Sequence, residues 1–187
     1  VCPPEHAASL AGKGVEAMSA DHPIPTERNL GAAEAVAAFV SRPGPPLLVL
    51  LSGGASAHLA SPRPPLGLAE LRTLTAALLA SGASISQINT VRKHLERLKG
   101  GGLAKLAGSR PVRVGVVCDV ISGDLAAVSS GPFVPERSTA ADAMQIMQAH
   151  DLVSAHPAAS AVLSDIDAGR APGAPAPDHP AFAAVTH

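Results

Sequence analysis

The stretch Leu47-Leu-Val-Leu-Leu51, followed directly by Ser52-Gly-Gly-Ala-Ser56, decides the fold. Five branched apolar residues in succession are typical of a strand that is buried on both faces, as in a parallel sheet covered by helices. Residues 112–118 form a second apolar strand, which runs into Asp119. Strands of this kind separated by helical sequence predict an α/β fold, with a mostly parallel, Rossmann-like sheet inside a three-layer sandwich.

Apolar periodicity and capping residues predict the helices around these strands. Asn29 and Ser138 are candidate N-caps, and Ser84 with Gln87 fits a capping box. Residues 171–180 are rich in Pro and Ala and are expected to form an exposed linker. The elements expected outside the two apolar strands are a short strand at 15–20 and helices at 30–40, 68–79, 84–98, 103–107, 138–150 and 158–168.

Composition restricts the function classes. The 187 residues are 47% hydrophobic and 16% charged, with a formal net charge of −1. Nucleic-acid binding is disfavoured, because the chain has no basic excess for phosphates and its only aromatic residues are three Phe. The longest apolar run is too short to cross a membrane. Two cysteines cannot build a disulfide framework or a zinc site, so a reducing, cytoplasmic setting is expected.

The segment Ser52-Gly53-Gly54-Ala55-Ser56 is a candidate anion site. Its backbone N–H groups can face a phosphate or carboxylate, since two glycines leave them unobstructed. A plain tight turn explains the same residues equally well. A hydrolase that uses Ser56 is a weaker interpretation, because His58 stands where the nucleophile elbow requires glycine.

Charged residues elsewhere suggest phosphate chemistry, each with a structural alternative. Asp119 and Asp124 follow a strand and could hold Mg²⁺, or could cap a turn and face solvent.

A second group of polar residues lies beside a glycine run and could offset phosphate charge. Its members are Asn89, Arg92, Lys93 and Lys99. The alternative for this second group is a solvated helix face, with Arg92 and Glu96 as a surface pair.

Taken together and in order, five blocks of this sequence resemble the type 2 glycerate kinases, specifically their larger N-terminal domain, which accompanies a smaller MOFRL domain. The resemblance extends over roughly residues 15–182. The blocks are Ser52-Gly53-Gly54-Ala55-Ser56-Ala57, Ser81-Gly82-Ala83-Ser84-Ile85 continuing through Asn89-Thr90-Val91-Arg92-Lys93-His94, Lys99-Gly100-Gly101 with Leu103-Ala104, Asp119-Val120 with Gly123-Asp124, and Ser130-Gly131-Pro132, with Asp21-His22-Pro23-Ile24-Pro25 upstream.

The resemblance implies ATP-dependent phosphorylation of D-glycerate at the 2-hydroxyl, with Mg²⁺, in a cleft between two α/β domains. Lys93 and Asp119 are the expected catalytic residues, and Asp119 is also the expected Mg²⁺ ligand. The expected substrate- and nucleotide-binding residues are Ser52, Gly53, Gly54, Ser56, Asn89, Arg92, Lys99 and Asp124.

The chain departs from the family in ways that bear on activity. The family has Ser where Glu96 stands and Arg where Gly102 stands, so this chain gains an anion and loses a cation near the expected phosphate contacts. Family members are also more than twice as long, so residues 1–187 are expected to be a partial domain that is inactive alone. A nucleotide- or hydroxy-acid-binding remnant without catalysis is the alternative, and a homodimer is possible.

Overall fold

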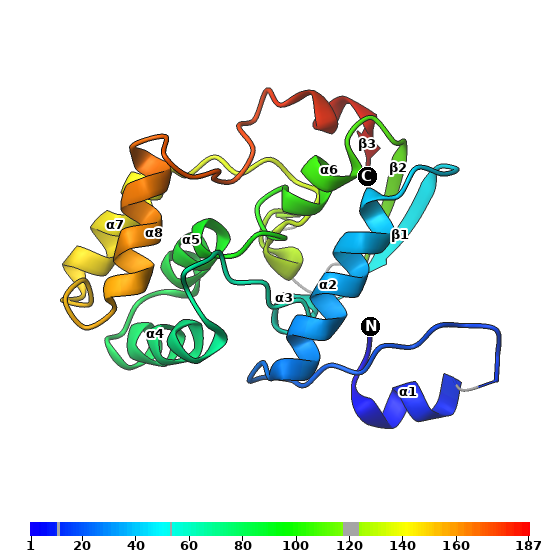
Figure 1. Cartoon of the computed structure of the whole chain (residues 1–187), viewed down its shortest axis with the longest axis horizontal. Coiled ribbons are helices and arrows are strands. Elements are labelled where there is room, and N and C mark those ends of the chain that lie inside the picture. The colour runs from blue at the N-terminus through cyan, green and yellow to red at the C-terminus, as the bar shows by residue number, and fades with distance from the viewer. Residues whose placement is uncertain (11, 53, 118–123) are drawn as a thin grey trace.

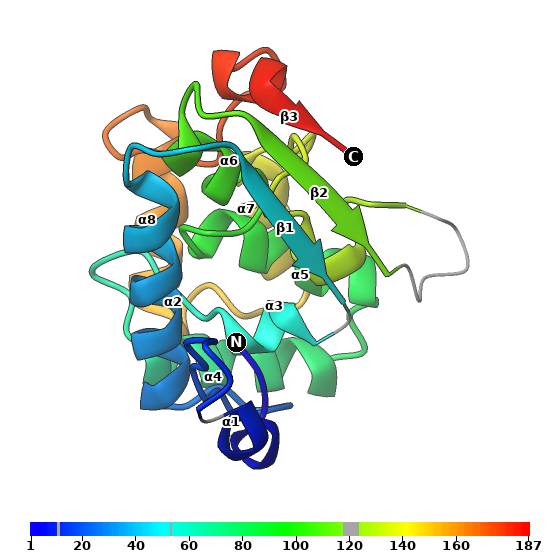
Figure 2. The ribbon, with the colours of Figure 1, turned by 90° about the vertical axis from the view of Figure 1, so that its right-hand side faces the viewer.

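In the described part of the chain, three parallel strands form the sheet, in the order β1-β2-β3. The computed structural model describes residues 1–187 except 11, 53 and 118–123. β1 (Leu47–Leu51) pairs along its whole length with β2 (Val112–Val116), so that Leu47 lies opposite Val112. β3 (Val185–Thr186) extends the other edge of β2, near the carboxyl end of the chain (Figure 2). β3 was not predicted, because a strand of two residues has no apolar periodicity.

Helices fill the space beside one face of the sheet and continue into a separate helical layer (Figure 1). No helix in the described ranges is long and apolar enough to span a membrane. The helices are α1 (Pro4–Leu10), α2 (Glu27–Ser41), α3 (Ala55–His58), α4 (Leu68–Ala80), α5 (Ile85–Leu95), α6 (Gly102–Ala107), α7 (Ala140–Ala149) and α8 (Pro157–Asp167), with 3₁₀ turns at Val128–Ser130 and Pro180–Ala184.

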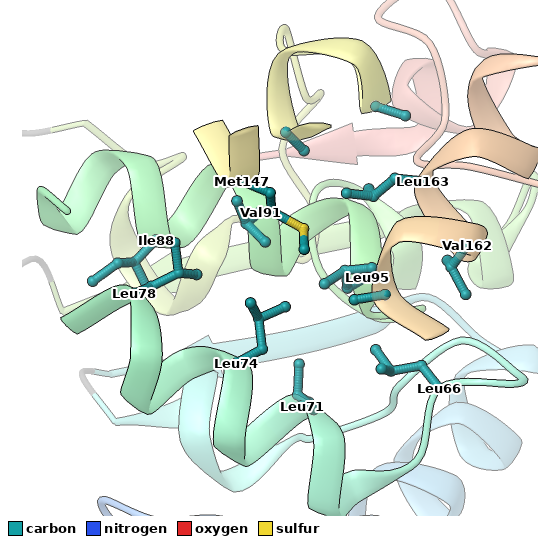
Figure 3. Packing of buried hydrophobic residues seen from close by; sticks show 13 residues of the cluster. Leu66, Leu71, Leu74, Leu78, Ile88, Val91, Leu95, Met147, Val162 and Leu163 are labelled. Carbon is teal, nitrogen blue, oxygen red and sulfur yellow. The ribbon is translucent and has the colours of Figure 1, made fainter. Parts of the chain in front are cut away.

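The apolar core has two parts. One lies between the sheet and helices α2 and α6, where Ala33, Leu103 and Phe133 pack against Val112 and Val114. The other joins α4, α5, α7 and α8, with leucine as its commonest residue and Met147 among its members (Figure 3). Because α5 lies between these parts, its polar side can face the loops that follow the strands.

The strand prediction for residues 47–51 is confirmed in its bounds, and so is the α/β class with a parallel sheet. The expectation that β1 is buried on both faces is wrong. Leu47 is buried against the helices, whereas Leu48 and Leu50 are 69% and 78% exposed on the opposite face. The described residues supply helices for one face of the sheet only, which is the physical reason for this exposure.

Several predicted boundaries moved because a neighbouring residue makes the better cap. α2 begins after Thr26, whose hydroxyl accepts from the Arg28 N–H, and Asn29 is the third helical residue of the resulting capping box. α7 begins after Thr139 instead of Ser138. The capping box of Ser84 with Gln87 is confirmed, but α5 ends at Leu95, three residues early.

The expected strand at 15–20 is wrong. The segment forms no strand there, and Ser19 makes only an isolated bridge with Cys2. Helices α4, α6 and α8 lie within two residues of their predicted bounds.

Candidate functional site

A polar hollow of about 330 Å³ lies beside the residues that follow β1. It is lined from four segments that are far apart in the sequence. These segments are residues 22–23, residues 54–57, the first and last turns of α5, and residues 127–130. Their convergence agrees with the general location of ligand sites beyond the carboxyl ends of parallel strands.

Ser52 and residues 54–56, which lead from β1 into α3, and the 3₁₀ turn at Val128–Ser130 form one wall of the hollow, and hydroxyl groups tie them together. The Ser56 and Ser130 Oγ atoms are 2.8 Å apart, and the Ser129 hydroxyl donates to the Ser52 carbonyl at 3.0 Å. Ser129, Ser130 and Gly131 all have positive φ, between 54° and 59°. Two consecutive non-glycine residues in the left-handed region are costly, so the surrounding contacts must hold this turn in place.

Gly54 is required by the geometry of the same wall. Its φ is +85°, and a Cβ there would lie 3.6–3.8 Å from the rings of His22 and His58. The absent side chain leaves this edge of the hollow to backbone atoms. The two histidine rings meet edge to face, with centroids 5.6 Å apart. Burial, together with the neighbouring His22, lowers the pKa of His58, which favours the neutral form of its ring.

Helix α5 supplies the opposite wall. Asn89 and Arg92 are three residues apart, so both project from one side of the helix into the hollow. The Arg92 guanidinium donates through Nε to Glu96 at 3.0 Å and through Nη2 to the Ser56 carbonyl at 3.2 Å. Among the described residues no hydrogen bond engages its Nη1.

Arg92, Glu96 and Lys99 form an ion cluster that contacts α3, because both cations donate to the Ser56 carbonyl. The Glu96 carboxylate is fully buried and contacts the Arg92 guanidinium at 3.0 Å and the Lys99 ammonium at 3.1 Å. Lys99 Nζ also donates to the Ser56 carbonyl at 2.6 Å. The interpretation of Arg92 and Glu96 as a surface pair is therefore wrong, because the loop and residues 96–99 enclose both partners.

Burial lowers the pKa of Lys99 to about 8, although the nearby Glu96 carboxylate opposes this shift. Its side chain is only 3% exposed and is occupied by Glu96 and by loop carbonyls. Lys99 therefore acts on the hollow indirectly, by fixing the position of the Ser56 peptide.

Lys93 occupies a different environment from Arg92, although it is the next residue. Its Nζ lies 2.7 Å from Glu136 Oε2, and both side chains are buried. The Glu136 carboxylate also accepts from the backbone N–H and the hydroxyl of Ser138. Lys93 does not line the hollow, and its catalytic role stays a prediction.

Glu136 should make the stability of the protein sensitive to acid. Burial alone would raise the pKa of this carboxyl, but hydrogen bonds from Lys93 and Ser138 outweigh burial and hold it below its usual value. A carboxyl whose pKa is lower in the folded chain than in the unfolded chain stabilises the fold at any pH above its unfolded-state pKa. This stabilisation is lost as the pH falls through the folded-state pKa.

We therefore expect the free energy of unfolding to fall more steeply from about pH 6 to pH 3 in the parent chain than in Glu136→Gln. Urea denaturation at several pH values measures this, with Glu34→Gln on the exposed side of α2 as the control for removal of one carboxylate. Parallel curves for the parent chain and Glu136→Gln would contradict the assignment.

Of the predicted site residues, the structure brings Gly54, Ser56, Asn89 and Arg92 together at the hollow. Ser52 lies beside it and accepts from Ser129. Asp124 is exposed, and its Oδ1 accepts from the Ala126 N–H at 2.9 Å. Gly53 and Asp119 lie outside the described residues.

Mg²⁺ finds no ready-made ligand set in the described part of the chain. Within that part no three His, Cys, Asp or Glu side chains gather as a group that could hold a metal ion. The prediction that Asp119 is a metal ligand is therefore not tested by these contacts.

Four residues of this region, namely Ser129, Ser130, His22 and Glu136, were not among the predicted site residues. Ser129 and Ser130 line the hollow, and the signal for them was a serine pair before Gly-Pro in the loop after the second strand. His22 lines it too, but its position next to Pro23 left its orientation open. Glu136 had no local signal, because its partner is 43 residues away in the sequence.

These features define a class of protein before any comparison. A parallel α/β domain with a hollow of hydroxyl, amide and guanidinium groups beyond its strands is suited to binding a small anionic substrate. Residues 1–164 match the family described as "Domain of unknown function (DUF4147)". The chain belongs to this family, which is that of the N-terminal domain of the type 2 glycerate kinases.

Relatives with recorded names are similar over most of this chain. The glycerate 2-kinase of Pyrococcus horikoshii is 39% identical over 142 residues, which cover 75% of this chain and 32% of that protein. The D-glycerate 2-kinase of Thermotoga maritima is 36% identical over 152 residues, which cover 80% of this chain and 36% of that protein. Two similar proteins of Agrobacterium vitis are instead named as candidate hydroxypyruvate reductases. The chain spans about a third of the length of these relatives.

A solved structure from Pyrococcus horikoshii superposes on this fold with a TM-score of 0.84 at 32% identity. The alignment covers 95% of this chain and 42% of that one. The described helices and strands are thus arranged as in part of a larger molecule.

Proposed function

We propose that this chain forms the substrate-binding part of a glycerate kinase, which transfers a phosphoryl group from ATP to the 2-hydroxyl of D-glycerate. Relatives and a solved structure that carry the name glycerate kinase support the proposal. The observation that carries it is the hollow, where residues from blocks of the family resemblance converge. Blocks around Gly54, Asn89 and Ser130 are separated by tens of residues yet line one cavity.

The chemistry of the lining suits an anionic hydroxy acid or a phosphate. Arg92 supplies a cation, and its Nη1 can donate to carboxylate or phosphate oxygens while Nε and Nη2 stay bound to Glu96 and the Ser56 carbonyl. Ser56 and Ser130 share one hydrogen bond, so one of the two hydroxyl hydrogens remains for a ligand oxygen. Asn89 can both donate to and accept from a substrate hydroxyl.

Catalysis in this proposal rests on position and electrostatics. Phosphoryl transfer requires little covalent help from the protein, and rate depends on holding donor and acceptor in line near positive charge. The ion cluster fixes Arg92 and the Ser56 peptide, so the donors are in place before substrate arrives. Mg²⁺ would supply further charge neutralisation next to the phosphates, with Asp119 and Asp124 as the proposed ligands.

Removal of the Arg92 guanidinium tests the proposal. In the full-length protein, we expect Arg92→Ala to lower turnover of D-glycerate by about 100-fold, since a cation aimed at the transferring group typically stabilises it by a few kcal/mol. A coupled assay for ADP measures the rate, and urea denaturation measures whether the variant is still folded under the assay conditions.

The matched control is Arg137→Ala, which removes an exposed arginine away from the hollow. Turnover of Arg92→Ala within threefold of the parent protein would contradict the assignment. Binding of ATP and D-glycerate without any product would instead identify a binding remnant.

A further inference from the structure

An apolar groove of about 580 Å³ lies beside the polar hollow. One wall is the loop of Pro23, Ile24 and Pro25, and the other is the outer side of α4, including Ala76 and Leu79. Ile24 and Leu79 are 57% and 61% exposed, which is unusual for large apolar side chains that face each other across a cavity. The volume is within the range of small-ligand sites.

The groove offers apolar surface even where its residues are polar. The Thr75 hydroxyl donates to the Leu71 carbonyl at 2.7 Å, and the Thr73 hydroxyl donates to the Glu70 carbonyl at 3.0 Å. These hydroxyls are therefore engaged by their own helix. Pro23 and Pro25 have no backbone N–H. The walls are suited to a flat, weakly polar group that is bound by burial more than by hydrogen bonds.

The groove and the hollow are adjacent and share two lining residues. Pro23 and Arg92 line both, so the guanidinium stands where the apolar groove meets the polar hollow. Arg72 adds a second cation on the groove side. A ligand that occupies both cavities must be apolar at one end and anionic at the other, with its charge near Arg92.

We propose that the groove binds the nucleoside end of a nucleoside di- or triphosphate whose phosphates extend past Arg92 into the hollow. This inference rests on the proposed function, because that function requires a nucleotide and an acceptor in one site. The inference places the nucleoside in the groove, on the Pro23–Pro25 side of Arg92. The phosphates and the acceptor then occupy the hollow.

Calorimetric titrations of the chain with ADP and with pyrophosphate test the assignment. The parent chain should bind ADP at least about tenfold more tightly than pyrophosphate, because only ADP has a nucleoside to bury. Ala76→Trp fills the groove from an exposed helical position and should abolish this difference while leaving pyrophosphate affinity within about twofold. Ala38→Trp, at an exposed position of α2, is the matched control and should retain it.

A second variant, on the opposite wall, tests whether the effect of Ala76→Trp comes from the groove and not from a local distortion of α4. Ile24→Ser removes part of the opposite wall and should weaken ADP binding severalfold without affecting pyrophosphate. Equal ADP affinity in the parent, Ala76→Trp and Ile24→Ser, or no ADP binding by the parent, would overturn the inference.

The kinase assay separates this inference from the proposed function. Product formation from D-glycerate with a Michaelis constant for ATP that Ala76→Trp leaves unchanged would retain the function and reject the groove. Loss of ADP affinity in Ala76→Trp, with no product from the parent protein, would retain the groove and reject the function.

Discussion

Replacing Glu96 with Gln is expected to destabilise the fold by about 3–5 kcal/mol, because it removes the counter-ion of two enclosed cations. The carboxylate is fully buried between Arg92 and Lys99, and it also accepts from the Ser61 N–H at 3.3 Å. Glutamine keeps the shape but brings an amide N–H₂ against at least one cation. Urea denaturation of the parent and the variant measures the difference.

The pH dependence identifies Lys99 as the origin of the loss. Burial lowers the pKa of Lys99 to about 8, and the Glu96 carboxylate works against that shift. Between the folded and unfolded pKa values the unfolded chain binds more protons, so stability rises with pH. Without Glu96 this rise should begin at lower pH and be larger.

Glu34→Gln is the control for Glu96→Gln. Glu34 pairs with Arg97 at the surface, with side chains that are 66% and 40% exposed, and such pairs contribute about 1 kcal/mol or less. Equal losses in Glu34→Gln and Glu96→Gln would show that the Arg92–Glu96–Lys99 cluster does not support the loop.

The second large effect is expected at Lys93 and Glu136. Lys93→Met leaves the Glu136 carboxylate buried without its cation, and Glu136→Gln leaves the ammonium without its anion. Each single variant should lose about 3 kcal/mol, whereas the double variant should lose clearly less than the sum, because neither isolated charge remains. The amide oxygen introduced by Glu136→Gln still offers an acceptor to the N–H and hydroxyl of Ser138. Additive losses would contradict a coupled pair.

The same double variant tests the predicted catalytic role of Lys93. If Lys93 acts on the transferring phosphoryl group, the folded double variant of the full-length protein turns over D-glycerate about 100-fold more slowly. If Lys93 serves only the ion pair, turnover stays within a fewfold of the parent value. The double variant is the suitable protein because its stability is closer to that of the parent.

The local features of the chain were readable from the sequence. The five-residue apolar run predicts β1 in its bounds, and apolar periodicity with capping residues predicts α2 and α4 to α8 to within three residues, whereas the short helices α1 and α3 were not predicted. These features depend on neighbours within one or two turns, so a short window contains the information. The resemblance identified the family, because the order and spacing of its sequence blocks can be recognised along the chain.

The surroundings of each charged side chain could not be predicted from the sequence. Arg92 and Lys93 are adjacent in the sequence, yet one faces the hollow and the other is paired with Glu136. The reason is geometric, since neighbours on a helix point about 100° apart and meet different elements. Nothing near Lys93 in the sequence identifies an acid 43 residues later.

By itself, then, the sequence determined an α/β domain with parallel strands, the main helices and a set of polar segments after the strands. Only the tertiary structure decided which of those polar groups share a cavity, that Glu96 is enclosed between two cations, and that an apolar groove opens beside Arg92. Helix and strand periodicity arise from local backbone geometry, whereas cavities and buried ion pairs arise from contacts between segments that are distant along the chain.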